Sequence, residues 1–189
     1  MSDPRMTVEE RARVVGLLQQ TRDDFLVTVE SVTDAQWNFR PGPDRWSIGL
    51  IAEHLGLVER GLFSRVEHAL GGDVNPDWES VIEKNGLIEQ MLQDRDTPRD
   101  APERVVPTGT VGREEALVIF REQRVRSLAF AETTAAQLKT HTLDHHRPMF
   151  GTLNAFQWLL YIPLHNQRHI EQIAEIQAAP DYPSGNEIS

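Results

Sequence analysis

Apolar residues recur at intervals of three and four along most of the chain, and clean alternation of apolar and polar residues is scarce. Such intervals return side chains to one face of an α-helix, whereas strands alternate. The pattern predicts four long helices, over residues 8–31, 47–71, 113–138 and 152–178. Residues 32–46 break the pattern, with Pro41-Gly42-Pro43 as a stop and one short helical turn at 33–37.

Residues 71–112 are the least regular segment of the chain. A short helix is expected near residues 81–92 with an interruption at Asn85-Gly86, and Pro98, Pro102 and Pro107 exclude a long helix. Such a segment is typical of a crossover between bundle helices that no tight turn joins. We therefore expect an all-α fold, a four-helix bundle with a long crossover between the second and third helices. It forms one domain of residues 1–179, followed by a flexible tail, 180–189.

Each long helix carries an apolar stripe that predicts the face turned toward the core. In the first helix the stripe consists of Val8, Ala12, Val15, Leu18, Phe25 and Val29. In the second helix the stripe contains Ile51, His54, Leu55, Val58, Leu62, Val66 and Ala69. In the last helix one face contains Trp158, Ile162, His165, His169, Ile173 and Ile176. Three histidines are thus predicted on inner faces of two helices.

The composition narrows the classes of partner. The formal charge is 19 − 29 = −10, which argues against binding to nucleic acid or to an anionic membrane surface. The chain has no cysteine, so disulfides, thiolate ligands and a cysteine nucleophile are excluded. The N-terminus does not resemble a signal peptide, and the longest apolar stretch, 158–163, is too short to span a bilayer. We expect a cytoplasmic protein that acts on a small molecule.

The three inner-face histidines point to a metal site. His165 and His169 are one helical turn apart, so their imidazoles project from the same face. Their spacing alone fits two polar surface residues equally well. On an apolar stripe, however, two neutral rings need partners for four nitrogens, and two charged rings would repel each other. A divalent ion binds one nitrogen of each ring, His54 supplies a third, and a position stays open for water or substrate.

Other polar residues are expected to face solvent or their neighbours rather than bind the ion. The histidines outside the set of three are His68, His141, His145 and His146, the last three in a solvated loop with Asp144. The charged residues expected on exposed faces or in salt bridges are Glu53, Arg121, Arg124 and Glu171. Gln172 lies three residues after His169 and is expected to form a hydrogen bond beside the ligands.

Two motifs resemble those of a known family. The first is Pro41, Arg45-Trp46-Ser47-Ile48 and Glu53-His54-Leu55, and the second is Trp158, His165-x-x-Arg168-His169 and Gln172-Ile173. They resemble the DinB-like (DNA-damage-inducible) metalloenzyme superfamily. The resemblance implies a four-helix bundle with up-down-down-up topology and a homodimer. It also implies a divalent metal ion, zinc or nickel above all, held by His54, His165 and His169.

Three functions are compatible with such a site. Characterised members of the family include transferases and isomerases that use a low-molecular-weight thiol such as bacillithiol or mycothiol, and a metal-bound thiol is a poised nucleophile. Hydrolysis by metal-bound water is the second function, and it requires a base close to the water. Because no acidic residue on an inner face adjoins the ligands, the sequence favours the thiol-dependent S-transferase or isomerase. The third function is a non-enzymatic, metal-stabilised binding domain.

Overall fold

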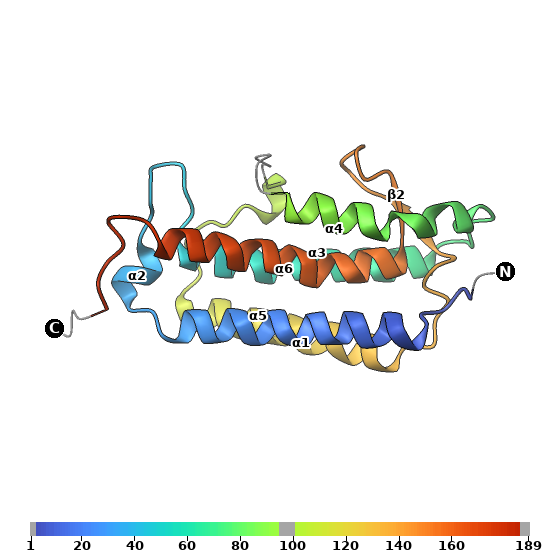
Figure 1. The fold of residues 1–189 in the computed structure, drawn as a ribbon, viewed down its shortest axis with the longest axis horizontal. Coiled ribbons are helices and arrows are strands. Elements are labelled where there is room, and N and C mark those ends of the chain that lie inside the picture. The colour runs from blue at the N-terminus through green and yellow to red at the C-terminus, as the bar shows by residue number, and fades with distance from the viewer. Residues whose placement is uncertain (1–2, 95–100, 186–189) are drawn as a thin grey trace.

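Four long helices form the body of the protein in a computed structural model that describes residues 3–94 and 101–185. They are α1 (Val8–Glu30), α3 (Ile48–Gly71), α5 (Arg113–Thr133) and α6 (Ala155–Gln177), and they lie side by side (Figure 1). Three of them begin at a side-chain cap, because Thr7, Ser47 and Asn154 each accept a hydrogen bond from the backbone N–H three residues later. The predicted all-α class is confirmed.

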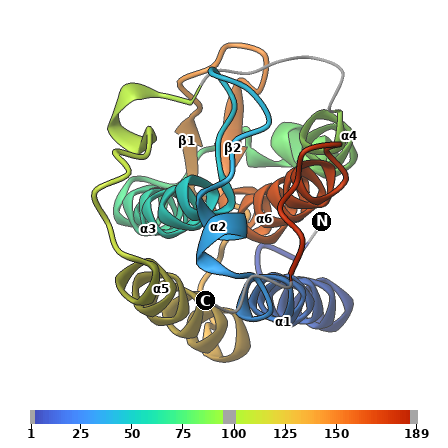
Figure 2. The same cartoon turned by 90° about the vertical axis from the view of Figure 1, so that its left-hand side faces the viewer.

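The helices run up-down-down-up. The neighbours α3 and α5 are parallel, since Glu59 pairs with Arg124 and, farther along both helices, Glu67 pairs with Arg126. Figure 2 shows the bundle end-on, with α3 and α6 in one layer above α5 and α1. A tight turn joins antiparallel neighbours only, so the parallel pair α3 and α5 requires a long crossover.

The described residues of the crossover form three short helices. They are the 3₁₀-helix η1 (Trp78–Lys84), α4 (Asn85–Gln93) and the 3₁₀-helix η2 (Glu103–Val105). Helix α4 packs along the outer side of α6 (Figure 2). The predicted interruption at Asn85-Gly86 coincides with the change from 3₁₀ to α geometry. Pro98 lies outside the described residues, as do residues 186–189 of the predicted tail.

A short helix, α2 (Asp34–Asn38), closes one end of the bundle where one helical turn was predicted. The chain beyond α6 lies against it. The side-chain N–H of Gln36 donates to the carbonyl of Pro183 at 2.9 Å, and the rings of Phe39 and Tyr182 meet edge to face with centroids 5.6 Å apart. The domain limit at residue 179 stays a prediction.

The third long helix is shorter than predicted. It ends at Thr133 rather than at residue 138, and Thr134 is already extended. Arg11 lies on α1, and its guanidinium donates to the carbonyls of Ala131 and Thr134. These hydrogen bonds satisfy two acceptors at the C-terminal end of α5. The contact between the two helices therefore decides where α5 stops.

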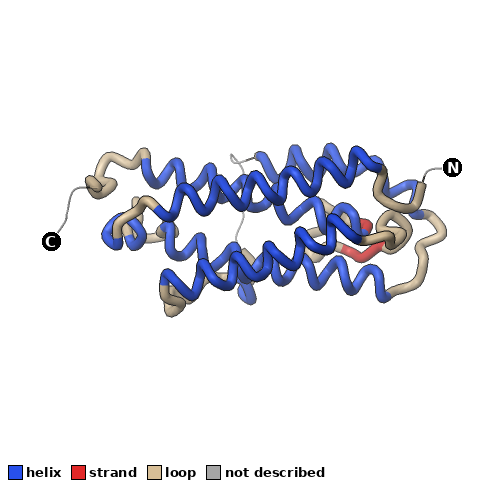
Figure 3. The backbone as a smooth tube through the Cα atoms, turned by 90° about the horizontal axis from the view of Figure 1, so that it is seen from below, coloured by secondary structure: helices blue, strands red, loops and turns tan. Residues whose placement is uncertain are grey.

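Residues 141–151, predicted as a loop, are part of a β-hairpin. Its strands β1 (Thr142–Asp144) and β2 (Thr152–Asn154) are antiparallel, with Leu143 opposite Leu153. Figure 3 shows the hairpin at the end of the bundle that carries the N-terminus. Strands of three residues are too short for an alternating pattern to reveal them. Because Asn154 caps α6, this helix begins at Ala155 rather than at residue 152.

The first half of the stripe predicted for α1 was wrong. Val8 is 80% exposed and Ala12 is also exposed. The buried positions of α1 are Val14, Leu18, Thr21, Phe25 and Val29. Val14 lies four residues before Leu18 and is buried with it, whereas the predicted stripe contained Val15 instead. The seven stripe positions predicted for the second helix, including His54, are all buried.

A buried ion pair joins α3 to α5. The side chains of Arg124 and Glu59 are both 0% exposed, and Arg124 donates through Nε and Nη2 to the two carboxylate oxygens, each at 2.9 Å. Arg124 also donates to the carbonyl of Leu18 and to Oγ1 of Thr21 on α1. One guanidinium thus ties three helices together, and the salt bridge expected for Arg124 is confirmed.

Removing one partner of this pair leaves an uncompensated buried charge. We expect Arg124→Met to lower the free energy of unfolding by about 3–5 kcal/mol, measured by urea denaturation. Arg121, also on α5, forms an exposed pair with Glu30 of α1, so Arg121→Met should lower the free energy of unfolding by less than about 1 kcal/mol. Equal losses in the two variants would contradict the structural role given to Arg124.

Candidate metal centre

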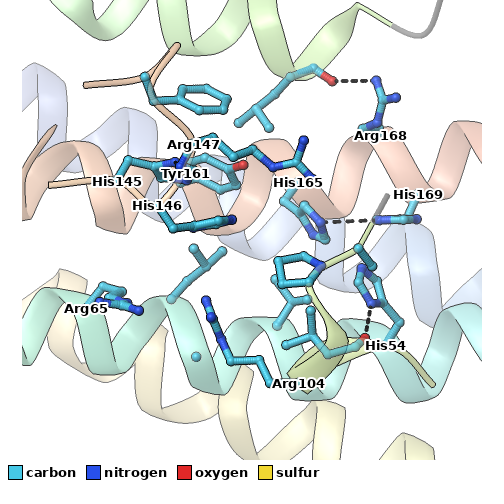
Figure 4. Close-up of a pocket in the computed structure, with 18 of the residues that line it drawn as sticks. His54, Arg65, Arg104, His145, His146, Arg147, Tyr161, His165, Arg168 and His169 are labelled. Atoms are coloured by element: carbon cyan, nitrogen blue, oxygen red, sulfur yellow. Dashed lines mark hydrogen bonds between the residues drawn. The ribbon is translucent and has the colours of Figure 1, made fainter. Parts of the chain in front are cut away.

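The structure brings His54, His165 and His169 together between α3 and α6 (Figure 4). The ring centroids are 5.3 Å apart for His54 and His165, 4.8 Å for His54 and His169, and 4.5 Å for His165 and His169. One potential ligand nitrogen from each ring lies within 4.8 Å of the other two. The three residues singled out in the sequence therefore form one cluster.

Hydrogen bonds from outside the cluster orient two of the rings. The Nδ1 of His54 lies 2.7 Å from the carbonyl oxygen of Val105, and the Nδ1 of His169 lies 2.8 Å from Oε1 of Gln172. Each partner is an acceptor, which assigns the proton to Nδ1 and leaves Nε2 as the lone-pair nitrogen. The hydrogen bond expected from Gln172 is confirmed. Such partners orient imidazoles in metal sites.

Burial keeps the imidazoles of His54 and His165 neutral. It lowers the pKa of His54 to about 4, although the bond to Val105 works in the opposite direction. Burial also holds the pKa of His165 well below its usual value, and the nearby His169 and His54 lower it further. Neutral imidazole is the form that binds a metal ion, so near pH 7 these two rings need no deprotonation before binding.

The residues present fit a divalent ion. Two nitrogens bound to zinc at ~2.0–2.1 Å in tetrahedral geometry lie roughly 3.3–3.4 Å apart. The Nε2 atoms of His165 and His169 are 3.3 Å apart. Three imidazoles leave at least one coordination position for another ligand, which is the ligand number of catalytic rather than structural zinc sites. The nitrogen donor set also suits nickel, cobalt and iron(II).

Glu53, next to His54 in the chain, is buried rather than exposed as expected. Its carboxylate accepts hydrogen bonds from the backbone N–H and hydroxyl of Thr108 and from the N–H of Gly109, each at 2.9 Å. Gly109 has a φ of +74°, in the region that favours glycine. Glu53 points away from the cluster, yet it fixes the loop just after Val105, whose carbonyl orients His54.

A cavity of about 440 Å³ lies beside the cluster, with His54, His165 and His169 in its wall. The indole of Trp46 covers one side, with its centroid 4.7 Å from that of His54 and 6.2 Å from that of His169. Other apolar wall residues come from α3, the β-hairpin and α6: Val58, Leu62, Phe150 and Trp158. The cluster thus borders a chamber of small-molecule size whose wall is partly apolar.

His145 and His146 also line this cavity. His145 is buried, which corrects the solvated position expected from the sequence, whereas His146 is exposed as expected. His145 is 7% exposed, and its ring stacks on Trp158 with centroids 5.0 Å apart and on His146 at 4.3 Å. The backbone N–H of Arg147 donates to Nδ1 of His145 at 3.0 Å. The hairpin folds these residues over α6, and no spacing along the sequence links them to that helix.

The other residues of the predicted loop serve the fold. The Oδ1 of Asp144 accepts a hydrogen bond from the hydroxyl of Thr152 at 2.7 Å, across the hairpin. The Nδ1 of His141 lies 3.1 Å from the carbonyl of Gly72. His68 is exposed, and so is Glu171, as expected for the latter. None of these four residues lines the 440 Å³ cavity.

Comparisons show which known proteins this chain is similar to. Residues 17–173 match the DinB superfamily. The chain is 28% identical over 172 residues to the uncharacterized protein YuaE of Bacillus subtilis (strain 168), covering 86% of this chain and 96% of that protein. Its fold is similar to that of YfiT from Bacillus subtilis, with a TM-score of 0.65, 16% identity and coverage of 94% and 91%. YfiT is described as a probable metal-dependent hydrolase with an unusual four-helix bundle topology. Within the described residues, no helix is both long and apolar enough to cross a membrane.

The hydrogen bond from His169 to Gln172 predicts graded effects on metal affinity. We expect Gln172→Ala to weaken zinc binding about 10–100-fold, because His169 loses its orienting partner, and His54→Ala to weaken it further. His141→Ala, outside the cavity, should leave affinity unchanged. Competition with a chromophoric chelator measures all three, and a loss confined to His141→Ala would place the ion at the hairpin instead.

The environment of His145 predicts a dependence of stability on pH. Burial is the main cause that lowers the pKa of His145 from 6.5 to about 4, and the nearby titratable groups of His146, Arg147 and Arg65 contribute to this lowering. Between these values the unfolded chain binds a proton that the folded chain does not, so stability falls as pH drops from 6.5 toward 4.

His145→Phe keeps an aromatic ring in the stack and removes this titration. Relative to wild type, we expect the variant to gain roughly 2 kcal/mol between pH 7 and pH 4, less than the full shift would give because solvent reaches part of the ring. Urea denaturation of the metal-free proteins measures the difference. Parallel pH profiles would show that His145 is protonated equally in both states.

Proposed function

The chain belongs to the DinB superfamily, and from that premise we propose that it is a divalent-metal-dependent hydrolase acting on a small molecule. His54, His165 and His169 would hold the ion, and the observation that carries the proposal is their convergence on one point with orienting partners behind two of them. A divalent ion in such a site acts as a Lewis acid and activates water near neutral pH. The description of YfiT as a probable metal-dependent hydrolase supports the same class of chemistry.

The protein's contribution begins with positioning. The carbonyl of Val105 and the side chain of Gln172 hold two imidazoles in fixed orientations, so the site is organised before the ion binds. Trp46 covers two of the rings and keeps bulk water from that side. Exclusion of water strengthens the electrostatic interactions at the reacting group.

A hydrolase also needs a group that accepts a proton, and His146 suits that role. It lines the cavity, and within the described part of the chain no hydrogen bond engages its ring nitrogens. Burial, then the nearby arginine charges, lowers its pKa, so the ring is neutral at pH 7. The absence of a nearby base in the sequence favoured thiol chemistry. With His146 in the cavity, that reason no longer holds.

Thiol-dependent transfer is retained as a second candidate, because the same ion and cavity would serve a thiol cofactor. The choice between zinc and nickel and the expected homodimer also stay predictions. The two reactions are separable in one assay. Hydrolysis consumes water and requires no added thiol, whereas transfer requires a thiol supplied from solution, since the chain has no cysteine.

The experiment uses zinc- and nickel-loaded protein against a panel of small esters, amides and phosphoesters, with and without cellular thiols. We expect cleavage without thiol that stops on chelation and returns with the ion. His146→Gln should lower kcat about 10²–10⁴-fold while metal content stays unchanged, as expected for a lost general base. His141→Gln is the matched control.

Turnover that requires a thiol would replace hydrolysis by transfer. Full activity of the chelated protein would overturn the metal-dependent proposal itself.

A further inference from the structure

The cavity is strongly basic although the protein is acidic. The chain carries a formal charge of −10, yet the charged residues in the cavity lining are five arginines and one aspartate. The arginines are Arg45, Arg65, Arg104, Arg147 and Arg168, and the aspartate is Asp44. A concentration of one sign of charge in a cleft raises the local concentration of ligands of the opposite sign.

Two of these arginines have structural partners. Arg45 lies 3.5 Å from the carboxylate of Glu175, and Arg168 donates to the backbone carbonyls of Leu92 and Asp94. These bonds hold the N-terminal side of α3 and the end of α4 against α6. Arg45 and Arg168 are therefore accounted for by the fold.

Arg65 and Arg104 differ from them. Within residues 3–94 and 101–185, neither side chain forms a hydrogen bond or an ion pair. They come from separate elements, Arg65 from the C-terminal half of α3 and Arg104 from η2. Figure 4 shows both on one side of His146, with Arg147 on the other. Burial is the largest cause of the lowered pKa of His146, and the charges of Arg104, Arg147 and Arg65 lower it further. The three guanidinium groups therefore act on the same region of the cavity.

We propose that Arg65 and Arg104 bind an oxyanion group of the substrate, which is therefore a small organic acid carrying a carboxylate or a phosphate. Guanidinium presents a planar fork of donors that matches both groups. Phe150 and Trp158 line the same cavity, and their aromatic rings suit an apolar body of the substrate. The reaction of such a substrate rests on the proposed function. The binding of its anionic group to the two arginines does not require the metal ion.

The test measures binding to the metal-free protein by NMR titration. The probes are benzoate and phenylphosphonate, which distinguish a carboxylate from a phosphate site, and benzamide, the neutral analogue of benzoate. We expect at least one anion to bind about tenfold or more tightly than benzamide, with affinity falling as salt rises. Arg65→Gln and Arg104→Gln should each weaken that anion about tenfold. Arg121→Gln removes the same charge outside the cavity and should have no effect.

Two results would overturn the proposal. One is benzamide binding as tightly as both anions. The other is anion binding that requires added zinc and persists in the Arg65→Gln/Arg104→Gln variant, because the ion would then hold the anion. Neither result touches the proposed function, since metal-dependent cleavage of a neutral ester would still stand. Conversely, His165→Ala should abolish metal binding and leave anion binding to the metal-free protein intact.

Discussion

The packing of three imidazoles against one another between two helices is the constraint on which the rest of this structure depends. An imidazole removed from water must remain neutral and must find partners for its nitrogens. Val105 and Gln172 provide partners for the outer nitrogens of His54 and His169, and the inner nitrogens then face one another. A divalent ion is the partner that satisfies several lone pairs at one point.

The bundle topology serves this arrangement. Because α3 and α5 run parallel, the chain must travel the length of the bundle between them, and that crossover passes the site. It supplies the carbonyl of Val105, the loop fixed by Glu53 and the cavity residue Arg104. The β-hairpin between α5 and α6 adds the two cavity histidines. The segments that connect the helices thus supply side chains and a carbonyl group to the site, which short turns between helices would not supply.

The helices and the three clustered histidines could be predicted because each depends on local periodicity. His54, His165 and His169 lie on apolar stripes that are visible in the sequence. The N-caps of the two helices that carry them are local features as well. The hairpin, His145 and the buried state of Glu53 could not be predicted, since they depend on segments far apart in the chain. Glu53 contacts residues 55 and 56 positions away, and no pattern in either segment indicates that contact.

The central claim is that these three histidines hold one ion whose remaining coordination faces the cavity. Anomalous diffraction from crystals of the zinc-loaded protein tests it most directly. We predict one zinc peak per chain with three imidazole nitrogens at ~2.0–2.1 Å and no fourth protein ligand. A peak at the hairpin histidines, or a protein side chain closing the fourth position, would contradict the account.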